Sequence, residues 1–267
     1  MGVGIHSAIH LFKIADKLRF RGELLTLGVQ DACFTTDRLR EMALRYSLPP
    51  PPSNWQPVVN NREPFKSRKH ITGDSLWSYL GFNSVTSVDV SDYEEATTRL
   101  DLNEQHVPEK LRGKFDVVFD GGTIEHVFHL PNALRNLHEL TKVGGVIIHQ
   151  TPSLPLIDHG FYMFSPTFFH DYYTANGYEI VDLQLVMYSV NWEHEPCWFT
   201  DYTPGCLAWV SNKGYCFPGM NFLVLGAFRK RESSTGDVIP QQGAYVKHWE
   251  RAMTINSLTK WQGTPQQ

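Results

Sequence analysis

The sequence lacks the features that mark several large classes of protein. Its 24 basic and 28 acidic residues give a formal net charge of -4 and a pI near 6.3. The positive charge typical of a nucleic-acid-binding domain is therefore missing. The 4 cysteines include no Cys-x-x-Cys pair and are too few to crosslink a chain of 267 residues. We expect no nucleic-acid partner and a protein of the reducing cytoplasm.

Long hydrophobic runs are missing as well. No stretch approaches the roughly 18 consecutive apolar residues that a membrane-spanning helix needs. Residues 1–16 mix His6, His10, Lys13 and Asp16 with apolar residues, so they do not resemble a signal peptide. We expect neither a signal peptide nor a membrane partner.

The composition is that of a large folded body, with 42% apolar and 13% aromatic residues. We predict one α/β domain over residues 1–230 with two insertions. The proline-rich insertion at 48–73 should be extended and run over the surface. The aromatic insertion at 191–220 should be either a packed satellite loop or a cover over a substrate pocket. A loosely attached tail at 231–267 should carry one helix, at 244–258.

The segment from Phe115 to Pro152 is the most informative. Residues 115–119 are apolar and β-branched, which is typical of a strand buried on both faces. A turn at 120–122 follows. Apolar residues at steps of three and four then predict a helix that begins at Ile124 and is ended by Gly144 and Gly145. Residues 146–149 should form the next buried strand.

The same reasoning predicts the other elements. We expect strands at 22–28, 85–90, 98–100, 178–190 and 221–228, and helices at 9–18, 37–46, 74–80 and 165–176. Asp74 should cap the third of these helices.

Three successive strands end at an aspartate, namely Asp89, Asp101 and Asp120. Asp is common in turns, so one such residue is unremarkable. In an open α/β sheet, ligands bind beyond the carboxyl ends of the strands where the strand order reverses. Three carboxylates at that edge predict a site that receives hydroxyl and amino groups.

With these residues in place, the chain resembles the class I S-adenosylmethionine-dependent methyltransferases over about residues 24–229, most strongly at 85–152. The resemblance implies a Rossmann-like α/β fold with a mostly parallel seven-stranded sheet, helices on both faces and an antiparallel last strand. The sequence Glu125-His126-Val127 is similar to the ubiquinone-pathway-like, small-molecule branch.

The resemblance also implies S-adenosylmethionine as the cofactor. The residues that match the family's cofactor contacts are Asp89 and Val90 for the ribose hydroxyls, Asp101 and Leu102 for the adenine amino group, and Asp120, Gly121 and Gly122 for the methionine part. A carboxylate suits the first two tasks, because it accepts charge-assisted hydrogen bonds from a diol or an amine.

The loop after the first sheet strand departs from the family's glycine-rich pattern. Only Gly28 remains where three glycines are usual, and Gln30 and Asp31 occupy neighbouring positions. We expect Gly28 to allow close approach of the backbone to the cofactor. Gln30 and Asp31 would bind its amino-acid end. The same change is expected of a methyltransferase fold that has lost its cofactor, so a non-catalytic binding protein stays open as the alternative.

The candidate catalytic residues are His126 and His159, with Glu125 beside them. Histidine suits a general base, since its unperturbed pKa is near 6.5. We expect one of the two to accept a proton from an acceptor hydroxyl, so that the reaction is O-methylation of a small molecule such as a sugar or secondary metabolite. A divalent cation held by Glu125, His126 and His159 is the alternative. We expect no metal, because Gly122 stands where a second glutamate would be needed.

A nucleotide-dependent oxidoreductase would share an acidic residue after its second strand. The chain lacks the Gly-x-Gly-x-x-Gly sequence that brings a helix N-terminus to a pyrophosphate, which argues against that class. The acceptor and the oligomeric state, a homodimer included, stay open.

Overall fold

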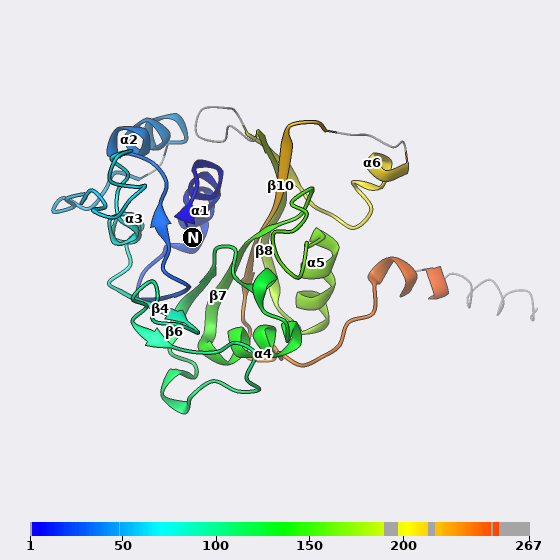
Figure 1. Ribbon diagram of the computed structural model, residues 1–267. Coiled ribbons are helices and arrows are strands. Elements are labelled where there is room, and N and C mark those ends of the chain that lie inside the picture. The colour runs from blue at the N-terminus through cyan, green and yellow to red at the C-terminus, as the bar shows by residue number, and fades with distance from the viewer. Residues whose placement is uncertain (1, 48, 190–196, 213–216, 247, 251–267) are drawn as a thin grey trace, which may run out of the picture.

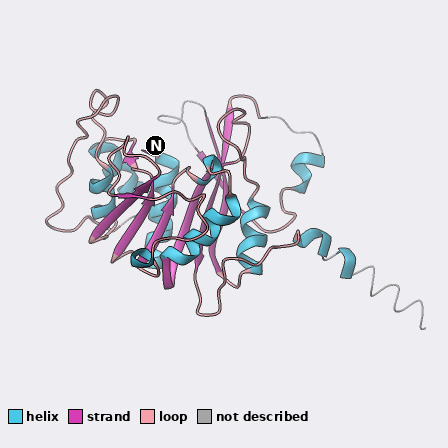
Figure 2. Ribbon diagram, turned by 60° about the horizontal axis from the view of Figure 1, so that its bottom comes forward, coloured by secondary structure: helices cyan, strands magenta, loops and turns pink. Residues whose placement is uncertain are grey.

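The computed structural model describes residues 2–47, 49–189, 197–212, 217–246 and 248–250. Its main sheet has eight strands in the order β5-β4-β2-β6-β7-β10-β8-β9. The strands are β2 (Glu23–Leu27), β4 (Ser84–Asp89), β5 (Thr98–Arg99), β6 (Phe115–Asp120), β7 (Thr141–Pro152), β8 (Glu179–Ser189), β9 (Cys197–Asp201) and β10 (Met220–Arg229). Figure 2 shows them side by side across the molecule.

The directions of the strands match the predicted sheet. β5, β4, β2, β6 and β7 pair in parallel, whereas β10 pairs antiparallel with both β7 and β8. Without β9, this is a seven-stranded sheet whose last strand in the chain is antiparallel. β9 comes from the aromatic insertion and adds an antiparallel edge strand to β8, which the sequence did not predict.

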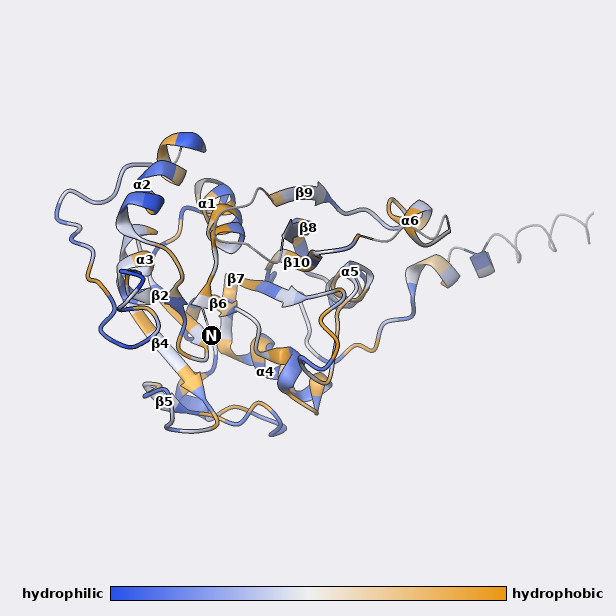
Figure 3. Ribbon diagram, turned by 45° about the horizontal axis from the view of Figure 1, so that its top comes forward, coloured by the Kyte–Doolittle hydropathy of each residue, from blue (hydrophilic) through white to orange (hydrophobic). Residues whose placement is uncertain are grey.

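Helices cover both faces of the sheet (Figure 1). The helices α1 (Ile5–Leu18), α2 (Thr36–Arg45) and α3 (Gly73–Tyr79) contribute to one apolar core, and α4 (Leu130–Leu140) and α5 (Pro166–Ala175) contribute to the other. A short helix, α6 (Ala208–Asn212), follows β9. The exposed side of α2 is largely hydrophilic in Figure 3, while Leu39 and Met42 on its other side are buried.

The crossover between β6 and β7 differs from its prediction at both ends. A 3-10 turn, η2 (Ile124–His126), and an extended link precede α4, which begins only at Leu130 with Pro131 in its first turn. Proline suits that position because it has no N–H to donate. At the other end, α4 stops at Leu140, and Gly144 and Gly145 lie inside β7. The helix predicted from Ile124 is therefore longer at both ends than α4 is in the structure.

The proline-rich insertion is anchored to α3 and does not only run over the surface. The backbone of Val58 accepts a hydrogen bond from Thr72 N–H, and Trp55 donates its indole N–H to the carbonyl of Ser75. Thr72 caps α3 through its side chain, which accepts from Ser75 N–H. The predicted cap, Asp74, is instead in the first turn.

The segment after β10 is also more firmly held than predicted. Asn176, at the end of α5, is 1% exposed and bonds with both Thr235 and Val238. Tyr172 donates its hydroxyl to the carbonyl of Gly236. Residues 243–246 and 248–250 are helical. The rest of the helix predicted at 244–258 lies outside the described residues.

Within the described part of the chain, every helix is too short or too polar to cross a bilayer.

Candidate functional site

The strand order reverses between β2 and β6, and the predicted site residues lie at the carboxyl ends of these strands and their neighbours. Leu27 of β2 is paired with Val88 of β4 and with Asp120 of β6, and Val88 is paired with Thr98 of β5. The ends of the four strands are therefore level. The acidic residues that follow them lie along one edge of the sheet.

Asp89 and Asp101 are half-buried at this edge, and each holds its own turn together. Oδ1 of Asp89 accepts from the N–H and hydroxyl of Ser91, and Oδ1 of Asp101 accepts from the N–H and amide of Asn103. Neither Oδ2 has a hydrogen-bond partner within the described residues. Each carboxylate thus has one oxygen outside these turn hydrogen bonds. Of their predicted companions, Val90 is 56% exposed and Leu102 is buried.

Asp120 has a different environment. Its side chain is fully buried, and Oδ2 lies 2.7 Å from Nδ1 of His149 on β7. Its Oδ1 accepts from the N–H groups of Thr123 and Ile124. Both oxygens are occupied by the protein itself. The carboxylate shapes the turn before Glu125, and it does not face the pocket described below.

The loop after β2 is closed by its own side chains. Gly28 has φ of 71°, which an L side chain rarely adopts. Gln30 is 3% exposed and donates its amide to the carbonyl of Leu27. Its Oε1 is buried and has no hydrogen-bond partner among the residues that the structure describes. A Cβ at Gly121 would lie 2.7 Å from that oxygen, so glycine leaves room for the Gln30 side chain in this position. Asp31 is paired with Arg62 of the insertion.

A pocket of about 210 Å³ lies beside this loop. Predicted residues line part of it, namely Gln30, Gly121, Gly122, Glu125 and His159. Gln150 of β7 also lines it, whereas the sequence did not identify the other polar residues, which include His6 and Ser7 of α1 and Tyr188 of β8. His6 is stacked on Tyr188 with ring centroids 4.3 Å apart. His6 and Ser7 belong to an amphipathic segment that gave no sign of packing across the sheet.

Glu125, His126 and His159 meet at the edge of this pocket. His159 Nε2 lies 3.5 Å and His126 Nε2 3.9 Å from Oε1 of Glu125. The loop carrying His159 is joined to the turn of η2 by the N–H of Tyr162, which donates to the carbonyl of Glu125. A Cβ at Gly160 would lie 2.9 Å from that carbonyl oxygen and 3.1 Å from Nδ1 of His126. Glycine at 160 therefore permits the close contact of the two segments.

The three side chains differ in exposure and in acidity. The Glu125 side chain is 0% exposed, whereas those of His126 and His159 are 43% and 44% exposed. Burial, with the nearby charge of Asp120, raises the pKa of Glu125 to about 8. Burial and the neighbouring His159 lower the pKa of His126. The cluster thus combines two solvent-exposed imidazoles, which can accept protons, with a buried carboxyl group that is easily protonated.

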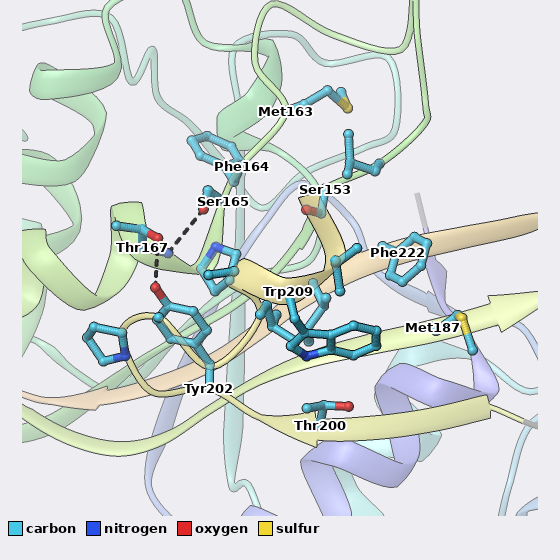
Figure 4. Close-up of a pocket in the computed structure, with 18 of the residues that line it drawn as sticks. Ser153, Met163, Phe164, Ser165, Thr167, Met187, Thr200, Tyr202, Trp209 and Phe222 are labelled. Carbon is cyan, nitrogen blue, oxygen red and sulfur yellow. Dashed lines mark hydrogen bonds between the residues drawn. The ribbon is translucent and has the colours of Figure 1, made fainter. Parts of the chain in front are cut away.

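A larger cavity, of about 880 Å³, lies on the other face of the sheet. Phe222 of β10 lines it, whereas the next residue, Leu223, lines the smaller pocket. Successive side chains of a strand point to opposite faces, which separates the two spaces. Figure 4 shows Trp209, Tyr202, Met187 and Phe222 around this cavity, with Tyr202 hydrogen-bonded to Thr167 at 2.7 Å. The aromatic insertion therefore covers a cavity, but not the one beside the histidines.

No protein-family model matches the chain, and no curated protein matches its sequence. Solved structures, several of them of methyltransferases, resemble it in outline. The YcgJ protein of Bacillus subtilis has 10% identity and a TM-score of 0.47 over 84% of this chain and 98% of its own. The 1,6-didemethyltoxoflavin-N1-methyltransferase of Burkholderia thailandensis has 13% identity and a TM-score of 0.43 over 85% and 80%. A possible histamine N-methyltransferase of Thermotoga maritima has 16% identity and a TM-score of 0.37 over 84% and 91%.

These similarities are too weak to carry an assignment, and the sheet itself supports the fold directly. Five strands pair in parallel, the order reverses between β2 and β6, and the last strand runs antiparallel between β7 and β8. Helices lie on both faces. The chain has the Rossmann-like α/β fold of the class I methyltransferases.

Proposed function

We propose that the protein is an S-adenosylmethionine-dependent methyltransferase that methylates a hydroxyl group of a small molecule, such as a sugar or secondary metabolite. The observation that carries this proposal is the cluster of Glu125, His126 and His159 beside a pocket at the strand-order reversal. Proton acceptors are what a hydroxyl acceptor requires at such a place.

The residues along the sheet edge fit the cofactor. Free Oδ2 atoms on Asp89 and Asp101 suit the ribose hydroxyls and the adenine amino group. The buried, unpartnered Oε1 of Gln30 suits the amino group of the methionine part, beside Gly121 and Gly122. The cofactor supplies an electrophilic methyl group on a sulfonium, so the chain itself contributes positioning and removal of a proton.

His159 is the better placed of the two candidate bases. It lines the pocket and lies closer to Glu125 than His126 does, at 3.5 Å against 3.9 Å. Its partly exposed imidazole would accept the proton of the acceptor hydroxyl. The bound cofactor would supply the methyl group, with its carbon–sulfur bond breaking to leave S-adenosylhomocysteine. In its ionised form, Glu125 would then stabilise the imidazolium, as a carboxylate does for a catalytic histidine.

A non-catalytic binding protein on the same fold is the second candidate, and the closed loop after β2 favours it. Asp31 is already paired with Arg62, so it is not available to a ligand. The pocket of about 210 Å³ is also smaller than the roughly 300 Å³ or more of ordinary small-molecule sites. In this second candidate function, the pocket binds a ligand smaller than S-adenosylmethionine.

Calorimetry separates the two. The full chain is titrated with S-adenosylmethionine, S-adenosylhomocysteine and NAD. Micromolar binding of both sulfur compounds and none of NAD supports the methyltransferase. The absence of binding by all three supports the second candidate. Incubation with methyl-labelled cofactor and a panel of hydroxylated sugars and phenols then tests transfer.

A further inference from the structure

The Glu125, His126 and His159 cluster has the composition and the geometry of a metal site with open coordination positions. One oxygen or nitrogen from each residue can be chosen so that all three lie within 4.8 Å of one another. Donor atoms bound to one tetrahedral Zn²⁺ at about 2.0 to 2.2 Å lie about 3.4 Å apart. The separations of 3.5 Å and 3.9 Å between the imidazole nitrogens and Glu125 Oε1 are close to that value.

The Glu125 carboxylate at the centre of the cluster makes no hydrogen bond with the described part of the chain. Glu125 is 0% exposed, and neither Oε1 nor Oε2 has a hydrogen-bond partner within the described residues. Buried polar atoms are nearly always paired, because an unpaired one loses its hydration without compensation. Its neighbour Asp120 shows the usual solution, with both oxygens bonded. Glu125 is aimed at two imidazoles that are too far away for hydrogen bonds and well placed to share an ion.

The surroundings would hold the three donors in place. Glu125 and His126 belong to the short turn of η2, which Asp120 fixes through two N–H groups. The loop of His159 is held against this turn by Tyr162 N–H and by the close approach of Gly160. The imidazoles are on the exposed side and the carboxylate is on the buried side, so an ion can enter from solvent.

We propose that Glu125, His126 and His159 bind a divalent transition-metal ion. Two imidazoles and one carboxylate favour Zn²⁺, Co²⁺ or Fe²⁺ over Mg²⁺ and Ca²⁺, which take oxygen ligands. Three protein ligands leave at least one coordination position for water or substrate. That position is next to the pocket, since both Glu125 and His159 line it.

The role of the ion depends on the proposed function, whereas its binding does not. An ion at this position would hold the oxygen of a hydroxyl acceptor and lower the pKa of that hydroxyl, which replaces a general base. The sequence led us to expect no metal, because Gly122 cannot supply a second glutamate. Two imidazoles and one carboxylate satisfy the minimum for a catalytic site without it.

The test is metal binding by the full chain in the absence of S-adenosylmethionine. Protein treated with a chelator and dialysed is titrated with Co²⁺ by visible absorption and with Zn²⁺ by calorimetry. We expect one saturable site without the near-ultraviolet band of thiolate ligands. Glu125→Gln and His159→Gln should each weaken binding about 100-fold or more, since even the loss of an outer hydrogen bond costs 10- to 100-fold.

His129→Gln is the matched control, because His129 is an exposed histidine three positions after His126. It should leave the affinity unchanged. Circular dichroism verifies that each variant is folded. If Glu125→Gln fails to fold, His159→Gln still provides the test, because it alters only an exposed loop. Equal affinity in wild type and His159→Gln, or no saturable binding of Co²⁺ or Zn²⁺ by wild type, would overturn the proposal. Cofactor binding without metal binding would leave the proposed function standing.

Discussion

Asp120 and His149 form a fully buried pair at the centre of the sheet, with Oδ2 of the aspartate 2.7 Å from Nδ1 of the histidine. The other ring nitrogen of His149 lies 2.6 Å from the hydroxyl of Tyr173 on α5. The pair therefore joins β6 to β7 and α5. The remaining oxygen of Asp120 fixes the turn that carries Glu125 and His126. A residue of the core thus determines where the candidate catalytic residues lie.

Asp120→Ala should lower the free energy of unfolding by about 3 to 5 kcal/mol, because it removes the partner of Nδ1 of His149 and of the N–H groups of Thr123 and Ile124. Asp120→Asn should cost less, since its amide can bond both with the turn and with His149. Urea unfolding followed by circular dichroism measures both changes.

Asp116→Ala is the matched control on the same strand. Asp116 is paired with Lys142 at 2.8 Å, but both side chains are more than a third exposed. Its loss should cost about 1 kcal/mol, as for exposed ion pairs and single hydrogen bonds. Equal losses in the two alanine variants would show that the buried pair has no special role in stability.

Asp89→Ala should weaken the binding of S-adenosylhomocysteine by about 1.5 to 3 kcal/mol, the usual loss for hydrogen bonds to a charged group. Calorimetry measures the change. Asp92→Ala is the control, since Asp92 is in the following turn and its side chain is 82% exposed. An unchanged affinity in Asp89→Ala would remove this residue from the site.

Gln30→Met should weaken binding more than it lowers stability. It removes the buried, unpartnered Oε1 from the pocket wall and keeps the length of the side chain. We expect affinity for S-adenosylhomocysteine to fall about tenfold, the loss of one hydrogen bond. The thermal midpoint should not fall by a comparable amount. A lower midpoint with unchanged affinity would mean that Gln30 serves the loop alone, through its bond to Leu27.

The sequence predicted the parallel strands well because their residues carry the signal locally. The apolar, β-branched run at Phe115 to Phe119 is buried on both faces, and β6 occupies it. Aspartates at the ends of β4 and β6 lie along one edge of the sheet, as predicted from their positions at the ends of parallel strands. The helix after β6 was overestimated because Val127 has the helical spacing yet belongs to an extended link. The spacing of apolar residues shows which positions are buried. A buried residue in an extended link, such as Val127, therefore cannot be told from one in a helix by spacing alone.

The environment of each site residue was beyond the sequence, since it depends on contacts distant along the chain. Nothing near Asp120 signals His149, and nothing near Asp31 signals Arg62. Likewise His6 reaches the pocket only because α1 packs against β8 and β10. Glu125, His126 and His159 were considered together, as catalytic residues and as a possible metal site. Their contact in the structure results from the return of the loop at Gly160, which the sequence does not indicate.

Stability should fall on acidification between about pH 6.5 and pH 4. Burial lowers the pKa of His6 to about 4, and burial with the nearby Lys230 lowers that of His138 to about 4. In the unfolded chain both histidines titrate near 6.5. The unfolded state therefore binds more protons in this window, and the stability present above pH 6.5 is lost as the pH falls. His6 alone contributes about 3 kcal/mol at most.

Urea unfolding at a series of pH values between 4 and 8 tests this dependence. His6→Gln cannot take up a proton, so its stability should change less over the window than that of wild type. His129→Gln, at an exposed position, should follow the wild type. Identical slopes for His6→Gln and wild type would show that His6 is not protonated on unfolding in this range.

Asn176 should prove the main attachment of the segment after β10. Its amide donates to the carbonyls of Tyr172 and Val238, and its oxygen accepts from Thr235 and from Val238 N–H. Asn176→Ala should lower the free energy of unfolding by about 2 to 4 kcal/mol, because several buried partners lose their bonds at once. Asn132→Ala removes a single amide bond, to the carbonyl of Asn103, and should cost about 1 kcal/mol. Limited proteolysis adds a local readout, because detachment would speed cleavage within residues 231–243 in Asn176→Ala alone. If both variants resist proteolysis equally, other contacts such as the Tyr172 hydroxyl to Gly236 hold the segment.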